Sequence, residues 1–577
     1  MLPMLAFLFT SRAQATCQDF CSTPNTNTAG GNTAQGNDAL GLINGAFDDT
    51  AMGEEAGFNL VNAIANTAIG SHALHSLVFT AGNTAVGSYS LYSNIGTSNT
   101  AIGADALTQN VGGNTNTASG TQSLFANMTG NNNSAHGAFA LISNVAGNNN
   151  TATGMNALFH SDADDNTAFG FNALYSNTSG IDNEANGYQA LYSNVIGSSN
   201  TACGTNALFS NLVDGNTAFG FDALYSNATG GGNSAMGFQS LNSNVIGVNN
   251  TAFGAQALFF NLADSNTAIG WQSLYRNNTG HDNTATGREA MAFNNGGVNN
   301  TADGSYTLYH NNGNFNTALG FSALVTNNAG QNNTAVGTNA SSANTNGANN
   351  VAVGLNSLLT NVVGNNNIAI GYKAGQSLTG NQNIDIGNPG AVGESNTIRI
   401  GTPGAPNGQV ATYVAGIYLA SIMGSGMPVR VDSSGKLGTM TSSARFKENI
   451  APMDKKSEAI LKLRPVTFQY KKEFDSTREA EFGLVAEDVE KVEPNLVVHD
   501  DTGKPFTVRY EAVNAMLLNE FLKEHRRVEE QATIIDELKK QVATLTATVK
   551  EATTQIQKVS AQLALDKSSP RLVSTSK

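Results

Sequence analysis

The amino-acid sequence predicts a mainly β protein, with a repetitive β-roll or β-solenoid, a small α+β domain and a C-terminal coiled coil. Three observations predict this architecture. A unit of 16–17 residues recurs over most of the chain, as in stacked-repeat folds. The 577 residues include 61 glycines and about 75 asparagines, a composition that disfavours long helices. An apolar pattern with a helical period is confined to the C-terminal part.

The charge distribution divides the chain near residue 441. Residues 1–441 carry 7 Lys and Arg against 21 Asp and Glu, whereas residues 442–577 carry 22 of each kind. The acidic part has too few basic side chains to neutralise phosphates, which excludes nucleic-acid binding there. No apolar run reaches the roughly 20 residues that a membrane helix needs, so no membrane span is expected.

The first 31 residues are expected to stand outside the repeats. Residues 1–9 are apolar and are followed by a small-residue Ala-Gln-Ala pattern, so 1–15 are predicted to be a signal peptide that lacks the usual basic start. The alternative is an apolar N-terminus without that role. Residues 16–31 form a short N-terminal segment before the first repeat.

The repeat occupies residues 32–401 and reads Asn-Thr-Ala-x-Gly-x-x-Ala-Leu-x-x-Asn, followed by a polar turn. Leu stands four residues after each closing glycine, with Met291 and Ser341 as exceptions. Such a unit suits one solenoid rung of two short strands and two turns. Alanine and glycine are expected where backbones crowd, leucines in an apolar ladder, and asparagines in left-handed turns. About twenty rungs at ~4.8 Å each give a rod on the order of 100 Å. Because so thin a core is poor, copies of the chain are expected to share it.

The repeats carry little chemistry. Three cysteines without histidines at ligand spacing make no zinc site, so no metal and no cofactor is expected. Inert cysteines are favoured over a disulfide between Cys17 and Cys21, and Cys203 stands alone. Three aspartates in one turn, Asp162, Asp164 and Asp165, could hold calcium, but the periodic aspartate of calcium-binding repeats is absent. A stacked column of threonines raises an ice-binding or carbohydrate-binding face as an alternative. The histidines fall at different repeat positions and form no predicted site: His72, His75, His136, His160, His281 and His310.

The Asn-Thr-Ala-Ile-Gly motif at residues 66–70 and 266–270 resembles the head repeats of trimeric autotransporter adhesins. This resemblance implies left-handed parallel β-rolls that assemble as trimers. The unit here is longer than the usual one of that family.

Residues 402–441 are expected to be a β connector, with a hairpin at Gly435-Lys436 after Asp432. Composition then changes abruptly, and residues 442–530 are expected to form the small α+β domain. Helices are predicted over 454–463 and 484–493, and strands over 465–471 and 506–510.

The segment 442–530 carries several motifs in order: Ser-x-x-Arg-x-Lys-Glu-Asn-Ile from Ser442, Leu-Arg-Pro-Val-x-Phe-x-Tyr from Leu463, Gly-Leu-Val-Ala-x-x-Val from Gly483, and Val-x-Tyr-x-Ala from Val508. It resembles the intramolecular chaperone auto-processing domain of endosialidase-type phage tailspikes, a self-cleaving serine–lysine peptidase family. The resemblance implies a domain that trimerises a fibrous passenger and then cuts itself off.

By that resemblance Ser442 is the catalytic nucleophile, Lys447 is the catalytic base, and the cleavage site lies between Thr441 and Ser442. The family often has Asp after its serine, where this chain has Ser443. A serine hydroxyl needs a base, and a lysine serves once burial favours its neutral form. Assembly that desolvates the pair would therefore couple cutting to oligomerisation.

The last part of the chain is predicted to be one long helix from Tyr510 to about residue 566. Residues 531–566 are expected to form a coiled coil, and 567–577 a disordered tail. The alternative is a lone amphipathic helix. The residue types in the seam favour a coiled coil of two helices by the usual packing rule, whereas the family resemblance implies a trimer. The apolar seam alternates three and four residues apart: Ile535, Leu538, Val542, Leu545, Val549, Ala552, Ile556, Val559 and Leu563.

Together these expectations describe a secreted or bacterial surface fibre, homotrimeric, with an autoproteolytic serine peptidase that acts once on its own chain. The passenger is expected to be an adhesin or binding shaft for a cell-surface or glycan ligand, and a phage virion location is disfavoured by the signal. Two alternatives remain: a structural fibre that does not cut itself, and a ligand-binding or ice-binding β-solenoid.

Overall fold

The computed structural model describes residues 31–402, 408–409, 412–414, 427–432, 435–475, 477–500 and 502–566. The predicted signal peptide, the N-terminal segment apart from Gly31, Cys17, Cys21 and the predicted disordered tail lie outside these residues. The chain divides into two compact units, Met1–Thr412 and Tyr413–Lys577. We call them the repeat unit and the C-terminal unit.

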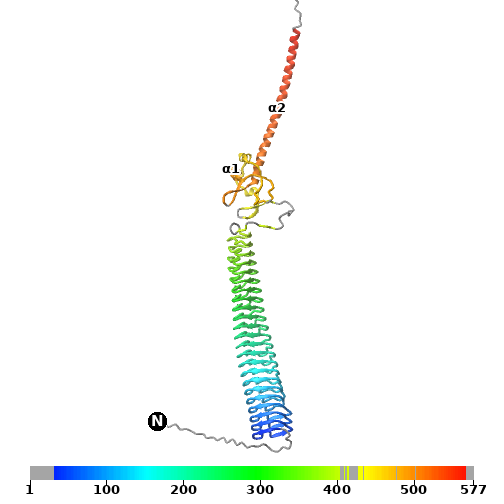
Figure 1. Cartoon of the computed structure of the whole chain (residues 1–577), viewed down its shortest axis with the longest axis vertical. Coiled ribbons are helices and arrows are strands. Elements are labelled where there is room, and N and C mark those ends of the chain that lie inside the picture. Colours follow the sequence, from blue (N-terminus) through cyan, green and yellow to red (C-terminus); the bar gives the residue numbers. More distant parts are fainter. Residues whose placement is uncertain are drawn as a thin grey trace, which may run out of the picture. The chain divides into compact units, whose positions relative to one another are not determined.

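The repeat unit is a β-solenoid, seen in Figure 1 as stacked rungs coloured from blue to yellow-green. Its main sheet has 23 strands, one per rung, each parallel to the next. They are β1 (Thr33–Gln35), β3 (Thr50–Met52), β5 (Thr67–Ile69), β7 (Thr84–Val86), β8 (Thr100–Ile102), β9 (Thr117–Ser119), β10 (Ser134–His136), β11 (Thr151–Thr153), β12 (Thr167–Phe169), β13 (Glu184–Asn186), β14 (Thr201–Cys203), β15 (Thr217–Phe219), β16 (Ser234–Met236), β17 (Thr251–Phe253), β19 (Thr267–Ile269), β21 (Thr284–Thr286), β23 (Thr301–Asp303), β25 (Thr317–Leu319), β26 (Thr334–Val336), β27 (Val351–Val353), β28 (Ile368–Ile370), β29 (Ile384–Ile386) and β30 (Ile398–Ile400).

The strands pair without a register shift, so equivalent residues stack along the solenoid. Ala218 of β15, for example, pairs with Ala202 and Ala235, and all three are buried. The closing glycine that follows each strand is required for two reasons. Gly220 has a φ of +139°, which disfavours any other residue, and a Cβ there would lie 2.4 Å from the carbonyl oxygen of Gly237. Alanine and glycine therefore stand where the backbones crowd, as predicted.

The leucine ladder also forms as predicted, but in an unexpected conformation. Ladder leucines such as Leu208, Leu224 and Leu241 are fully buried. Their φ angles lie between 47° and 54°, the left-handed region that bulky residues rarely adopt. Most rungs thus hold a leucine in a strained turn. Because burial between two neighbouring rungs fixes its position, the strain persists only within the stack.

Two columns of asparagine run through the interior of the solenoid. One precedes the strand, where the backbone N–H of Asn216 donates to Oδ1 of Asn200 at 2.9 Å. The other follows the leucine, where Nδ2 of Asn227 donates to Oδ1 of Asn211 at 2.8 Å. These buried side chains hydrogen-bond to one another and to the backbone from rung to rung, which explains why asparagine is so abundant in the sequence.

Three expectations about the repeats are wrong. Most described rungs hold one strand rather than two; second strands form only at β2 (Leu42–Asn44), β4 (Asn59–Val61) and β6 (Ser76–Val78), and at β18 (Phe260–Asn261), β20 (Arg276–Asn277), β22 (Phe293–Asn294) and β24 (His310–Asn311).

The shared core is the second wrong expectation, because the alanine and leucine ladders are already buried within a single chain. The third concerns the exceptions to the ladder. Gly57 and Gly375 also replace the leucine, and Leu60 and Leu378, three residues later, fill the space that each glycine leaves.

The C-terminal unit begins with the antiparallel hairpin of β31 (Val429–Val431) and β32 (Leu437–Thr439), which turns at Gly435 as predicted. Two more antiparallel pairs follow. In chain order the remaining elements are η1 (Ala444–Phe446), η2 (Asp454–Lys462), β33 (Val466–Phe468), β34 (Glu481–Gly483), α1 (Ala486–Val492), η3 (Pro494–Leu496), β35 (Val497–His499), β36 (Pro505–Val508) and α2 (Tyr510–Asp566). The predicted α+β domain is therefore present, with a 3-10 helix at η2.

The helix α2 runs for 57 residues, as the absence of Gly and Pro in this segment predicts. Its apolar seam is open to solvent in the single chain: Ile535, Leu538, Val542 and Leu545 are 50–64% exposed. The coiled coil stays a prediction, because a single chain contributes only one of its helices. Within the described part of the chain, no helix combines the length and the apolar character needed to cross a membrane.

Candidate functional site

Ser442 and Lys447 lie at the two ends of a single 3-10 turn. The helix η1 spans Ala444–Phe446, and the backbone N–H of Lys447 closes the turn on the carbonyl of Ala444. This turn brings Nζ of Lys447 to 3.4 Å from Oγ of Ser442. The structure therefore brings together the two side chains that the sequence singled out. Their catalytic roles stay a prediction.

The peptide bond between Thr441 and Ser442 is accessible in the single chain. All residues from Thr441 to Ile450 are exposed, including both members of the serine–lysine pair. The contact of 3.4 Å is longer than an ordinary hydrogen bond. Catalytic contacts are often long before the productive complex forms, so this geometry is compatible with a pair that tightens on assembly.

The hairpin β31–β32 ends two residues before this peptide bond and is joined to α2 by an ion pair. Nη1 of Arg430 lies 2.7 Å from Oε1 of Glu511, in the first turn of α2. The hydrogen bond from Arg430 lowers the pKa of Glu511 to about 2. A contact thus crosses from the chain before the Thr441–Ser442 bond to the chain after it, and no local sequence pattern predicts this contact.

A second serine–lysine pair lies between η2 and α2. Oγ of the buried Ser457 is 3.3 Å from Nζ of Lys523, and Asn519 donates a hydrogen bond to the same hydroxyl. Glu520 accepts from both Ser457 and Lys523, and its hydrogen bond raises the pKa of Lys523. A lysine held in its charged form is no general base. This network therefore fastens η2 to α2, and sequence analysis missed it because its members are 62–66 residues apart.

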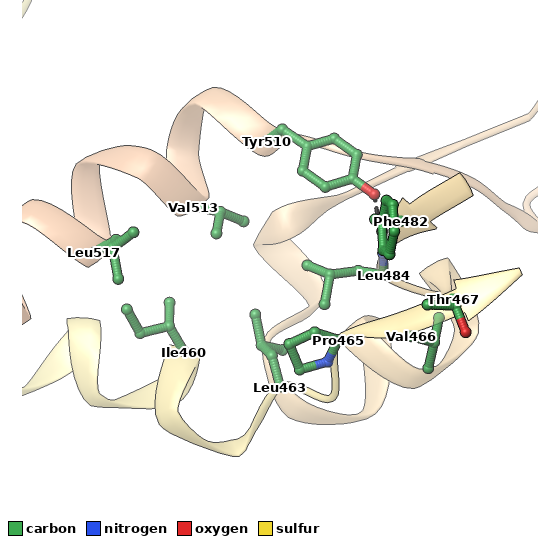
Figure 2. Close-up of a pocket in the computed structure, with 11 residues that line it drawn as sticks. Ile460, Leu463, Pro465, Val466, Thr467, Phe482, Leu484, Tyr510, Val513 and Leu517 are labelled. Atoms are coloured by element: carbon green, nitrogen blue, oxygen red, sulfur yellow. Dashed lines mark hydrogen bonds between the residues drawn. The ribbon is translucent and has the colours of Figure 1, made fainter. Parts of the chain in front are cut away.

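An apolar groove of about 690 Å³ lies beside this network, between η2, β33, β34 and α2. Figure 2 shows Ile460 and Leu463 on one side and Val513 and Leu517 of α2 on the other. The Tyr510 hydroxyl accepts a hydrogen bond from the backbone N–H of Leu484 at 3.0 Å and closes one end. The groove is lined by Ile460, Leu463, Pro465, Val466, Thr467, Phe482, Gly483, Leu484, Tyr510, Val513 and Leu517.

In the repeat unit, His72 and His75 lie together beside Glu55. Their Nε2 atoms lie 3.3 and 3.0 Å from Oε2 of Glu55. The signal was present in the sequence, since Glu55 and His72 stand at the same repeat position in successive rungs. Among the described residues, no group of three or more His, Cys, Asp or Glu side chains is arranged to hold a metal ion.

The aspartates considered for calcium have a structural role instead. Oδ1 of Asp162 accepts hydrogen bonds from the backbone N–H groups of Val145, Ala146 and Gly147 in the preceding rung. Asp164 and Asp165 accept from the asparagines of the same turn. These carboxylates therefore cap backbone donors of the neighbouring rung.

Comparison with known proteins supports the identification of the C-terminal unit. No curated protein and no solved structure matches the chain. The model of one family does match, over residues 442–498, and the match begins at the serine of the serine–lysine pair. The C-terminal unit is thus similar, as its motifs predict, to the chaperone of endosialidase, the family Peptidase S74.

Proposed function

We propose that the chain is a fibre protein whose C-terminal unit assembles it as a homotrimer and then cuts the chain between Thr441 and Ser442. The similarity of residues 442–498 to the chaperone of endosialidase supports assembly and a serine-peptidase type of activity. The observation that carries the assignment of the site is the contact of 3.4 Å between Lys447 Nζ and Ser442 Oγ.

In the proposed reaction Lys447 takes the proton of the Ser442 hydroxyl while Oγ attacks the carbonyl carbon of Thr441. The C–N bond then breaks, and the protonated lysine returns its proton to the leaving amine of Ser442. This exchange leaves an ester between Thr441 and the serine side chain. One water hydrolyses the ester, which releases the carboxylate of Thr441 and restores the hydroxyl. No co-reactant other than water is consumed.

Assembly is proposed to control this reaction. A lysine accepts a proton only when it is neutral, and burial favours the neutral form. In the single chain both side chains are exposed, so burial has to come from another copy. The open apolar surface of the same unit supports such a contact, because Phe446 and Ile450, beside the pair, are 58% and 70% exposed.

The passenger is proposed to act outside the cell as an adhesin or binding shaft, secreted or displayed on a bacterial surface. A long, acidic solenoid without a metal cluster among its described residues fits a structural or binding role rather than an enzyme of its own. The turns before the strands are exposed and repeat from rung to rung, for example at Asp214 and Asp264, and offer a repetitive face for a ligand.

The test is to purify the full chain and the variants Ser442→Ala, Lys447→Ala and Ser443→Ala. The wild type should yield two fragments, with the smaller beginning at Ser442, as measured by intact mass. Ser442→Ala and Lys447→Ala should leave a full-length chain that still sediments as a trimer. Ser443→Ala, next to the nucleophile, is the matched control and should cut like the wild type.

Two results would overturn parts of this proposal. A wild-type trimer that stays intact during prolonged incubation would exclude self-cleavage and leave a structural fibre. If the Lys447→Ala variant still cuts itself, Lys447 is not the general base, but the cleavage site between Thr441 and Ser442 stands.

A further inference from the structure

The outer surface of the main sheet carries a continuous column of side chains that we call the sheet stripe. It consists of two residues per rung: the last residue of each strand and the residue after the closing glycine. Phe169 and Phe171, on either side of Gly170, are one such pair. Because the strands pair without a register shift, these positions stack from rung to rung along the solenoid.

The sheet stripe is strongly apolar for a surface. Between β12 and β25 its large apolar side chains have exposed fractions between 36% and 53%, among them Phe169, Phe171, Phe219, Phe253, Trp271 and Phe321. Polar residues interrupt it in the rungs of β21 and β23. The largest apolar patch on a typical monomer is about 300–600 Å², and larger ones mark contact sites. A column that repeats large apolar side chains over this many rungs therefore calls for a partner.

The charges on the repeat unit identify the partner as a second copy. From β5 to β29, the sheet stripe carries two Asp, Glu, Lys or Arg residues, Arg288 and Asp303, in successive rungs. They have opposite signs and lie one rung apart, so Arg288 of one copy can reach Asp303 in the next rung of another copy, and Nε of Arg288 already lies 3.3 Å from Oε1 of Glu289 in its own chain. The turns before the strands instead carry aspartates only, such as Asp214 and Asp264. Pairing two copies through these turns would bring like charges together.

We propose that copies of this chain contact one another, parallel and in register, through the sheet stripe. This inference rests on the proposed homotrimer and adds which face of the solenoid is buried in it. A partner with the same spacing between rungs meets every apolar side chain of the stripe. The direction is part of the proposal: copies whose α2 seams pair in parallel run in the same direction along the chain, and the open seam of α2 is available for such pairing.

Cys203 gives a built-in probe of this contact. It is the last residue of β14, so it lies on the sheet stripe, between Asn186 and Phe219 of the neighbouring strands, and its thiol is free. In a parallel contact in register, the Cys203 side chains of different copies face each other. A short bismaleimide should then join two passengers through these thiols.

The experiment uses the full chain with Cys17→Ser and Cys21→Ser, so that Cys203 is the remaining thiol. The matched control adds Cys203→Ser and Ile196→Cys. Ile196 belongs to the same rung but lies in its turn, and it is 63% exposed. Sedimentation gives the oligomeric state of both proteins, and a denaturing gel after treatment with the bismaleimide gives the cross-linked fraction.

The proposal expects a trimer in which most Cys203 chains migrate as cross-linked pairs, at a yield that does not fall on tenfold dilution, whereas the Ile196→Cys control stays uncross-linked. A trimer that cross-links at position 196, or at neither position, overturns the sheet stripe as the contact and leaves the homotrimer standing. A monomer in sedimentation overturns the homotrimer itself, and the contact with it.

Discussion

The two units differ in how completely a single chain buries their apolar side chains. In the repeat unit the ladder leucines from Leu74 to Leu358 are fully buried, and their core is continuous. In the C-terminal unit the buried core holds five residues around Val489 and Leu496. Phe474 and Phe482 of that unit are about 80% exposed, and the whole seam of α2 is open.

This difference indicates which unit depends on contacts with other copies of the chain. The C-terminal unit presents apolar surface that a single chain leaves in water, so it gains most from assembly. The repeat unit has a closed core, but most of its rungs contain a leucine in a left-handed conformation, which costs roughly 1–2 kcal/mol. A rung without a neighbour has no contacts to offset that cost. The solenoid therefore grows well from an existing rung and starts poorly without one.

The largest expected effect on oligomeric state and cleavage comes from preventing the assembly of the C-terminal unit. Replacing Leu538 and Leu545 by Asp places unpaired carboxylates in the seam of α2, which costs several kcal/mol per trimer contact. We expect the variant to sediment as a monomer and the Thr441–Ser442 bond to remain intact, although Ser442 and Lys447 are unchanged. Sedimentation and intact mass measure the two outcomes on one sample.

The matched control for this variant carries Ala547→Asp and Thr554→Asp, which add the same charge at the same seven-residue spacing on the side of the helix opposite the seam. It should assemble and cut like the wild type. Efficient cutting by a Leu538→Asp/Leu545→Asp chain shown to be monomeric would separate catalysis from assembly. It would leave the serine–lysine pair in place.

The next effect tests the closed core of the repeat unit. Leu224→Ala removes a fully buried side chain between Leu208 and Leu241 and should cost about 2–5 kcal/mol in the free energy of opening the surrounding rungs. Amide hydrogen exchange of β14 to β16 measures this loss. Phe482→Ala, at 80% exposure in the C-terminal unit, should leave local stability within about 0.5 kcal/mol in a monomeric background. Equal losses at both positions would contradict the comparison.

Much of the repeat unit could be predicted because its period is visible in the sequence. Gly220 and Leu224 recur at fixed offsets, so both ladders and the stacking register follow from the spacing alone. The left-handed leucine and the single strand per rung could not be predicted, because they depend on how tightly adjacent backbones approach. The His72, His75 and Glu55 cluster was predictable in principle, from equivalent positions in successive rungs.

The C-terminal unit was predicted in a different way. Its helices and strands could be predicted from local sequence patterns. The serine–lysine site was predicted from the family resemblance, because a serine and a lysine five residues apart do not by themselves indicate catalysis. Local sequence does place Lys447 five residues after Ser442, where one turn joins them. It does not reveal Ser457 beside Lys523, or Arg430 beside Glu511, because such contacts between distant segments are fixed by the tertiary fold.

A smaller and pH-dependent effect is expected at the C-terminal end of the solenoid. Asp385 stands at the position of the buried alanine ladder, between Ala369 and Arg399, and its Oδ2 has no hydrogen-bond partner. Burial raises its pKa from 3.8 to about 6, with the charge of Glu394 adding to the rise. The folded state thus holds the proton more tightly than the unfolded state does. Stability of these rungs should fall as pH rises from about 4 through 6 and stay low above.

Replacing Asp385 by Ala completes the ladder and removes this cost. At pH 7 we expect β28 to β30 to open less easily by up to about 3 kcal/mol, measured by hydrogen exchange, with little difference at pH 4. Asp385→Asn keeps the size of the side chain and separates charge from packing. The same protection in wild type and Asp385→Asn at pH 7 would show that the carboxylate is not the source of the effect.

The smallest effect concerns an ion pair that joins the chain before the cleavage site to the chain after it, Arg430 with Glu511. If cutting leaves the β31–β32 hairpin docked, this pair helps to hold the passenger on the C-terminal fragment. Both side chains are at least 40% exposed, so solvent screens the pair and its contribution to affinity is small. Because the pKa of Glu511 is lowered from 4.5 to about 2, the contribution is complete above pH 4.5 and is lost as pH falls through 2.

Arg430→Gln should therefore speed release of the passenger at neutral pH and low salt, and the difference from wild type should vanish in high salt. Arg464→Gln breaks an exposed pair with Asp488 that lies wholly within the C-terminal fragment, so it should release the passenger at the wild-type rate.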